Sequence, residues 1–308
     1  MKRTSPPWGA RWPAPAKINI FLHILGRRDD GYHELQTAFQ FLDFCDDIVI
    51  DQTNDGEITR PMGLEGLAPE DDLAVKAAVL LREAASCRAG ARISIRKRIP
   101  QGGGLGGGSS DAATVLVALN TLWGLGMDLD ELSEIGRRLG ADVPVFLLGR
   151  AAWGEGTGER LVAMDFATPW HVVVKPACEV STRQVFESPE LTRNSAPITI
   201  TGFLSAGGRN DCLPVVSSLY PEVVEALEWL QDQQVRLGVD DRPDSDATRR
   251  QAKLTGTGAC VFAGFDSEAE AKSVFDRLPG RWSGFVARGV NVSPLLRMWD
   301  RQRQVGAD

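Results

Sequence analysis

The sequence is short of positive charge and of long apolar runs. It has 34 lysine and arginine residues against 41 aspartate and glutamate residues, a formal net charge of −7. That balance disfavours broad binding to nucleic acid or to anionic membranes, which attract basic surfaces. No stretch approaches the roughly 18 apolar residues that a membrane span needs, and the first residues lack the apolar stretch of an export signal. We expect a cytoplasmic protein that binds neither nucleic acid nor membrane.

Cysteine is also scarce. The five cysteines are scattered, and no two have the CxxC spacing. An odd number without close pairs is typical of neither a disulfide framework nor a zinc site. Buried, reduced thiols are the expected result, in keeping with a reducing cytoplasm.

The length favours two domains. The chain has 308 residues, of which 43% are hydrophobic, whereas one domain usually holds about 100 to 200 residues. After about residue 165 the pattern changes to short strands, such as 171–175, alternating with helices, such as 221–234. We therefore predict one domain over 1–165, a second over 166–308, and a cleft between them.

Periodicity predicts the elements around the most glycine-rich segment. Residues 93–99 alternate as a strand that stops at Pro100, and apolar residues over 112–123 recur at helical spacing, as one face of an amphipathic helix. A helix over 129–139 should end at Gly140, with Asp142 as the cap of the next one. Earlier in the chain, 15–25 alternates as a strand with Ile18, Ile20, Leu22 and Ile24 on one face and Lys17, Asn19 and His23 on the other.

Three loops complete this outline. Asp29-Asp30-Gly31 is typical of a turn, and 154–158 is typical of a hairpin loop. The polar stretch 238–250 lacks periodicity and is predicted to be a surface loop without an assigned role.

The segment between the strand and the helix, residues 101–111, reads QGGGLGGGSSD. Its glycines let backbone amides approach an anion closely, and a helix that begins there adds the positive end of its dipole. A linker of this composition would not normally join a strand directly to a helix. The segment is therefore predicted to bind phosphate.

Known phosphate loops of three kinds do not fit. Gly102, Gly104 and Gly107 satisfy GxGxxG, but a dinucleotide fold needs a strand ending in an acid about 20 residues later, and that region is predicted to be helical. The chain has no Gly-Lys dipeptide, which removes the Walker A loop, and it lacks the VAIK, HRD and DFG motifs of protein kinases.

The sequence resembles the GHMP small-molecule kinases instead, whose signature is a proline followed by a glycine- and serine-rich loop that opens a helix. Pro100 to Ser110 matches it, and further matching motifs follow the family's order over most of the chain: PAKIN at 15–19, DGYHEL at 30–35, LGADVP at 139–144 and TGTGAC at 255–260. The resemblance implies an α+β fold, with an N-terminal domain like ribosomal protein S5 and a ferredoxin-like C-terminal domain.

The resemblance also implies the chemistry. Asp142 matches the catalytic aspartate and Lys17 the lysine that supports it; read singly, Asp142 would be a helix cap and Lys17 a solvated strand residue. ATP, accompanied by Mg²⁺ whose ligands stay open, is expected on a loop formed by Lys97, Pro100, Gln101, Gly102, Gly103, Gly104, Leu105, Gly106, Gly107, Gly108, Ser109 and Ser110.

The acceptor implied by these motifs is a cytidine-diphosphate-linked polyol of an isoprenoid-precursor route. Tyr32, His33 and Phe186 match positions that hold the cytosine ring, and the remaining acceptor contacts are expected from Asn19, Asp142 and Thr182. Sibling kinases of mevalonate, homoserine or sugars remain alternatives, as does a silent nucleotide-binding regulator. The protein is expected to be a monomer or homodimer.

The sequence departs from the family pattern at a few positions. Asp72 stands where the family usually has asparagine, which puts an expected adenine or ribose contact in doubt. Thr255 and Thr257 replace serines and keep both hydroxyls.

Overall fold

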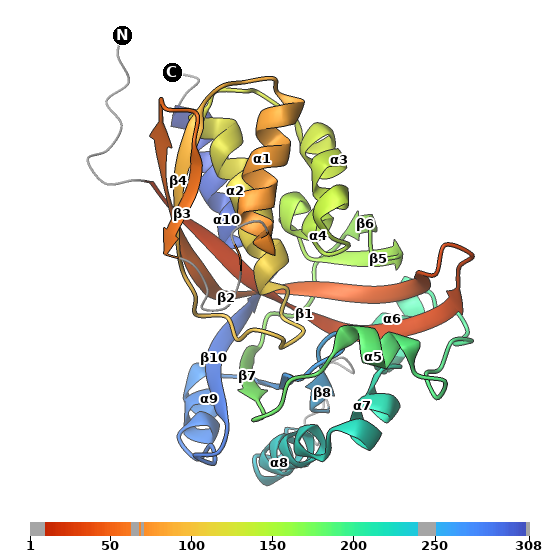
Figure 1. Cartoon of the computed structure of the whole chain (residues 1–308). Helices are drawn as coiled ribbons and strands as arrows, with labels where there is room; N and C mark the ends of the chain where they lie inside the picture. The colour runs from red at the N-terminus through yellow and green to blue at the C-terminus, as the bar shows by residue number, and fades with distance from the viewer. Residues whose placement is uncertain (1–9, 63–67, 69–70, 240–250, 306–308) are drawn as a thin grey trace.

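The computed structural model describes residues 10–62, 68, 71–239 and 251–305, drawn in colour in Figure 1. Of the stretch predicted as a polar loop at 238–250, only Gly238 and Val239 lie inside these ranges. Among the described residues, no helix combines the length and the apolar character needed to cross a membrane. The fold is of the mixed α+β kind that the sequence predicts.

Two long strands form the spine of the molecule. β1 (Ala10–Arg27) and β2 (His33–Thr53) pair antiparallel and are interrupted by three register shifts along β1. The turn between them uses Gly31 at φ +89° and a 2.8 Å bond from the Arg28 amide to the Tyr32 carbonyl, as expected for glycine at a positive φ. Both faces of β1 are buried, because Lys17, Asn19 and His23 are as inaccessible as the isoleucines opposite them.

The remaining strands extend this hairpin into one sheet. They are β3 (Ile58–Met62), β4 (Gly90–Arg96), β5 (Ala152–Gly156), β6 (Arg160–Ala163), β7 (Trp170–Lys175), β8 (Lys253–Leu254), β9 (Val261–Phe265) and β10 (Ser283–Val290). The order is β3-β4-β2-β10-β7-β9-β8, with β1 and β5 also paired to β2, and β6 paired to β5. The predicted hairpin loop at 154–158 is therefore partly strand, since the turn itself falls at 157–159.

Five helices gather on one side of the spine, at the top of Figure 1. They are α1 (Leu73–Ala84), α2 (Gly107–Leu122), α3 (Leu129–Leu139), α4 (Val143–Leu148) and α10 (Pro294–Val305). The expectation of a single apolar face on α2 is wrong, because every residue from Ser110 to Asn120 is buried. α2 is buried all round because α1, α3, α4, α10 and both long strands contact it.

The second half of the chain builds a separate core below the spine. Its helices are α5 (Thr182–Glu187), α7 (Leu213–Leu219), α8 (Pro221–Arg236) and α9 (Glu268–Phe275). Phe203 of α6 (Ile200–Ala206) packs instead against Phe21 of β1 and Trp153 of β5. α10 then returns to the first core, where Leu295 and Trp299 are buried against β1 and α2. The boundary near residue 165 stays a prediction, and the last helix lies with the first half of the chain.

Candidate active site

A cavity of about 550 Å³ opens where the two halves meet. Its wall includes Lys17 and Asn19 from β1, the glycine loop, Asp142 before α4, and Thr182 and Phe186 from α5. Segments that are far apart in the sequence thus converge on one space. The structure brings together here the predicted catalytic pair and every predicted acceptor residue.

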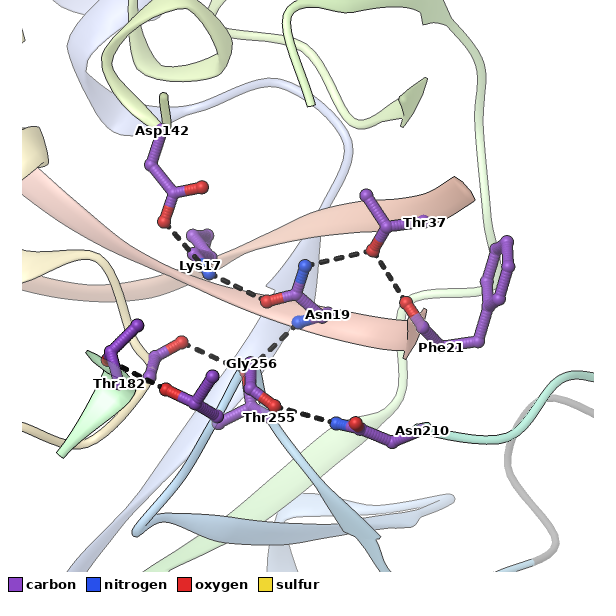
Figure 2. A network of polar contacts seen from close by, with 11 residues as sticks. Lys17, Asn19, Phe21, Thr37, Asp142, Thr182, Asn210, Thr255 and Gly256 are labelled. Atoms are coloured by element: carbon purple, nitrogen blue, oxygen red, sulfur yellow. Dashed lines mark hydrogen bonds and ion pairs between the residues drawn. The ribbon is translucent and has the colours of Figure 1, made fainter. Parts of the chain in front are cut away.

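Lys17 and Asp142 form an ion pair at the cavity wall (Figure 2). The Lys17 Nζ lies 3.1 Å from Asp142 Oδ2 and donates to Asn19 Oδ1 at 2.6 Å. The Lys17 side chain is 4% exposed and that of Asp142 is 35% exposed. The cation is therefore buried and held by two oxygens, whereas the carboxylate reaches the space that a ligand would fill.

Asp142 stands at the N-cap position of α4 without acting as a cap. Its backbone is helical at φ −84° and ψ −13°, and its side chain accepts no hydrogen bond from the first turn. A capping residue normally has an extended backbone and bonds the amide two or three residues on. The predicted helix start is confirmed, but the carboxylate faces Lys17 instead.

Asn19 links the ion pair to the rest of the site. Its Nδ2 donates to Thr37 Oγ1 at 2.9 Å, and the Thr37 hydroxyl donates to the Phe21 carbonyl at 2.5 Å. Its backbone amide donates to Thr255 Oγ1 at 3.0 Å, and that hydroxyl donates to the Gly104 carbonyl at 3.1 Å. One chain of hydrogen bonds therefore couples Lys17 to the glycine loop.

The glycine loop turns its carbonyls into the protein. The carbonyls of Gly102, Gly103, Gly104 and Leu105 accept from Ala259 N, Cys260 N, Thr255 Oγ1 and Lys17 N at 3.0 to 3.2 Å. Within the described chain, no acceptor bonds the amides of 102–109. This arrangement leaves a row of donors at the start of α2, which is the geometry of an anion cradle.

Close packing explains why glycine is required in the loop. Gly104 and Gly106 have φ of +73° and +71°. A Cβ on Gly104 would lie 2.1 Å from the Thr255 carbonyl oxygen, and one on Gly106 would lie 2.7 Å from the Phe146 ring. A side chain at either position would clash with the protein itself, whether or not a ligand is bound.

A second cavity of about 360 Å³ also borders the loop. Gly104, Gly106 and Ser109 line both cavities. The second one also contains Lys97 and the whole segment from Ile99 to Ser109. Two cavities thus meet at the same loop, and Lys17 and Asp142 line the first of them.

Lys97 is not a free cation in this cavity. Its Nζ contacts Asp46 and lies 2.7 Å from Asp111 Oδ2, and its side chain is 15% exposed. Burial lowers the Lys97 pKa, but the charges of Asp111 and Asp46 outweigh it and raise the pKa overall. Burial also raises the pKa of Asp111 to about 7, against the opposing effect of Lys97.

The Asp72 carboxylate is occupied by contacts within the protein. It caps α1 by accepting from the Ala74 amide at 2.9 Å, and it forms an ion pair with Arg60. Both residues line the second cavity. The departure from asparagine therefore places a charged pair where the family pattern predicts a neutral amide.

The predicted base-holding residues lie together on the first cavity. Tyr32 is 64% exposed, as its turn position predicts, and His33 is 8% exposed. The His33 ring stacks on Phe186 with centroids 5.1 Å apart and planes at 30°. Nearby, the hydroxyls of Thr182 and Thr257 lie 2.9 Å apart, which places a polar contact beside this aromatic wall.

Sequence reasoning missed two supporting residues. Thr37 holds Asn19, and Asn210 Nδ2 donates to the carbonyls of Leu254 and Gly256 at 3.0 and 2.8 Å. Asn210 thereby fixes the segment that packs against Gly104. Neither residue belongs to a motif or a periodic face, so only long-range proximity could have found them.

An amide cradle at a helix start, beside an ion pair between a buried lysine and a partly exposed aspartate, is the arrangement expected of a kinase of the GHMP class, and residues 72–150 match the GHMP kinases N terminal domain family. The 4-diphosphocytidyl-2-C-methyl-D-erythritol kinases of Alkalilimnicola ehrlichii and Halorhodospira halophila are each 53% identical to this chain. The alignments cover 94% and 92% of this chain and 94% of each relative. The chain belongs to the 4-diphosphocytidyl-2-C-methyl-D-erythritol kinase family.

A solved structure agrees with this assignment. The crystal structure of a 4-(cytidine 5'-diphospho)-2C-methyl-D-erythritol kinase superposes with a TM-score of 0.77 at 32% identity. The match covers 91% of this chain and 99% of that one. The predicted two-domain GHMP kinase fold is confirmed.

Proposed function

We propose that this protein transfers the γ-phosphoryl group of ATP to the 2-hydroxyl of 4-diphosphocytidyl-2-C-methyl-D-erythritol, in the methylerythritol phosphate route to isoprenoid precursors. The observation that carries the proposal is the meeting of two cavities at Gly104, Gly106 and Ser109, with Lys17 and Asp142 lining the first. Donor and acceptor each have a space, and both spaces border the same loop.

The nucleotide belongs on the second cavity, with its phosphates on the unbonded amides of 102–109. These amides and the dipole of α2 favour negative charge. Because the cradle is backbone and is held by Thr255, Ala259 and Cys260, it is organised before the phosphate arrives. Lys97 lines the same cavity, but its Nζ is paired with Asp46 and Asp111, so the proposed attraction for phosphate comes mainly from the amides.

Asp142 is the proposed proton acceptor. As the acceptor hydroxyl oxygen attacks the γ-phosphorus, its proton passes to the Asp142 carboxylate, the bond from phosphorus to the bridging β–γ oxygen breaks, and ADP leaves. Lys17, 3.1 Å from Asp142 Oδ2, orients the carboxylate, and its charge stabilises the negative charge that develops at the transferred group.

Mg²⁺ is proposed to arrive with the nucleotide. The described residues contain no grouping of three carboxylate, histidine or cysteine ligands. Magnesium in kinases is usually held by substrate phosphates, waters and one or two protein oxygens, and the Ser109 hydroxyl lines both cavities. The site therefore fits such an ion, which would neutralise phosphate charge, and Ser109 is the residue proposed to face it.

Recognition of the acceptor is proposed to depend on its base. Tyr32 and Phe186 offer aromatic surface for stacking, and His33 offers a ring nitrogen to the base edge. Asn19 and Thr182 line the same cavity and are proposed to contact the polyol diphosphate. Mevalonate, homoserine and sugars carry no base that could stack on this aromatic wall, so the wall favours the cytidine-linked acceptor over them.

A phosphoryl-transfer assay with ATP tests the proposal. The panel contains the cytidine-diphosphate acceptor, mevalonate, homoserine and galactose. We expect turnover with the first compound alone. Faster turnover of another acceptor would replace this function by that of a sibling kinase, and ATP binding without turnover of any acceptor would favour a silent regulator.

A further inference from the structure

Arg193 joins the two walls of the base-binding part of the cavity. It follows α5, and its guanidinium donates to the carbonyls of Phe186, Ser188 and Leu191 at 2.7, 2.9 and 3.2 Å. Its Nε donates to His33 Nε2 at 3.0 Å. His33 begins β2, so this one side chain connects the start of that strand to the end of α5.

The bond to His33 determines where the imidazole proton lies. A guanidinium has only donors, so Nε2 must accept and cannot carry a hydrogen. The ring is then neutral, with its single proton on Nδ1. No described residue bonds Nδ1, and the ring borders the acceptor cavity. His33 is then able to donate from Nδ1 to a ligand in that cavity.

The surroundings of His33 favour the same state. Burial lowers its pKa, and the positive charges of Arg193 and Arg27 lower it further. The stack on Phe186 limits rotation of the ring. Phe186 is itself held through its carbonyl by Arg193, so the tautomer and the ring position have a common support.

We infer that Arg193 is a positioning residue for base selection: it fixes His33 as a neutral donor and so selects a base whose facing edge accepts. Cytosine presents acceptors at N3 and O2, whereas N3 of uracil carries a hydrogen and would oppose the donor. The inference rests on the proposed function, because it takes a pyrimidine-linked acceptor as the ligand of this cavity. It adds a reason why the cavity prefers one pyrimidine to the other.

The test compares wild type with Arg193→Met, which keeps the stem and loses the donors, and Arg193→Gln, which keeps a neutral donor. Arg277→Met is the matched control, since Arg277 is exposed and its guanidinium bonds only the Ser273 carbonyl among described residues. KM and kcat are measured for ATP, for the cytidine acceptor and for its uridine counterpart. Nitrogen-15 NMR of the imidazoles reports the tautomer, and the chain has only three histidines to assign.

We expect wild type to hold the His33 proton on Nδ1 and to prefer the cytidine acceptor. Arg193→Met should raise the KM for that acceptor about tenfold or more and reduce the preference for cytidine over uridine. The ATP KM should stay unchanged, and Arg193→Gln should recover part of both losses.

The experiment distinguishes failure of the inference about Arg193 from failure of the proposed function. A wild-type His33 that is charged, or protonated on Nε2, overturns the inference even if Arg193→Met does not fold. A raised KM with an unchanged preference would give Arg193 a structural role alone, and would also overturn it. Absence of wild-type activity on the cytidine acceptor would instead refute the proposed function, while the NMR result would still report the tautomer.

Discussion

Lys17 and Asp142 form one ion pair but differ in burial. We therefore expect their substitution to lower kcat alike and to lower the free energy of unfolding by different amounts. Loss of a positioned proton acceptor lowers kcat by about 10² to 10⁴, or roughly 3 to 5 kcal/mol of transition-state stabilisation. We expect Asp142→Asn and Lys17→Met each to reach this range with little change in ATP KM. Because the residues act as one unit, the double variant should be far less impaired than the product of the two single effects.

The free energy of unfolding should differ between variants at these two positions. Asp142→Ala leaves the Lys17 ammonium, whose side chain is 4% exposed, with Asn19 Oδ1 as its remaining oxygen partner among the described residues. An unpaired buried group of this kind costs about 1 to 3 kcal/mol. Lys17→Met leaves a carboxylate that is 35% exposed, which water can solvate. Urea unfolding should therefore show a larger loss for Asp142→Ala.

Steady-state kinetics and the unfolding curves decide this reasoning. A kcat for Asp142→Asn within about threefold of wild type would remove it as the proton acceptor. Fully multiplicative effects in the double variant would show that the ion pair is not a catalytic unit. Equal stability losses for Asp142→Ala and Lys17→Met would contradict the asymmetry in burial.

Three further predictions concern the loop, the base and pH. Gly106→Ala should raise the ATP KM by about tenfold or more, because its Cβ would meet Phe146 and Lys17 Cε; Gly124→Ala, also at positive φ but with open space, should not. Tyr32→Ala should raise the acceptor KM about tenfold with the ATP KM unchanged, and Tyr32→Phe should restore it, since stacking is worth roughly 1 to 3 kcal/mol per base. The Asp111 pKa of about 7 lies above the unfolded value of 3.8, so the native state holds the proton more tightly and its stability falls as pH rises between these values. Asp111→Asn should therefore raise the melting temperature at pH 8 more than at pH 4.5, and an equal shift at both would show that Asp111 does not titrate there.

Local sequence signals were enough to predict several of the helices, strands and turns. Alternation placed β1 and β4, the glycine at 31 placed the turn, and the helical pattern of 129–139 placed α3 with its end at Gly140. The position of the glycine loop between a strand and a helix predicted an anion site, since chain geometry alone makes amides converge there. These signals need no contact between distant residues.

The burial of β1 and α2 was decided by tertiary packing. Lys17 and Asn19 alternate with apolar residues, which predicts a solvated face, yet both are almost inaccessible because they face the second half of the chain and the glycine loop. The polar residues at the start of α2, Ser110 and Asp111, are likewise buried among neighbouring helices. Periodicity reports polarity, and it does not show which polar side chains find partners.

The assembly of the site was also a matter of tertiary structure. The residues that fix the loop, Thr255 and Cys260, are separated from it by about half the chain, and Asn210 and Arg193 belong to segments without regular structure. Their roles arise from hydrogen bonds across the junction of the two cores. The motifs indicated which residues carry the chemistry, and the long-range contacts decided how Lys17, Asp142 and His33 are held, because charge, tautomer and orientation depend on neighbours that the sequence places far away.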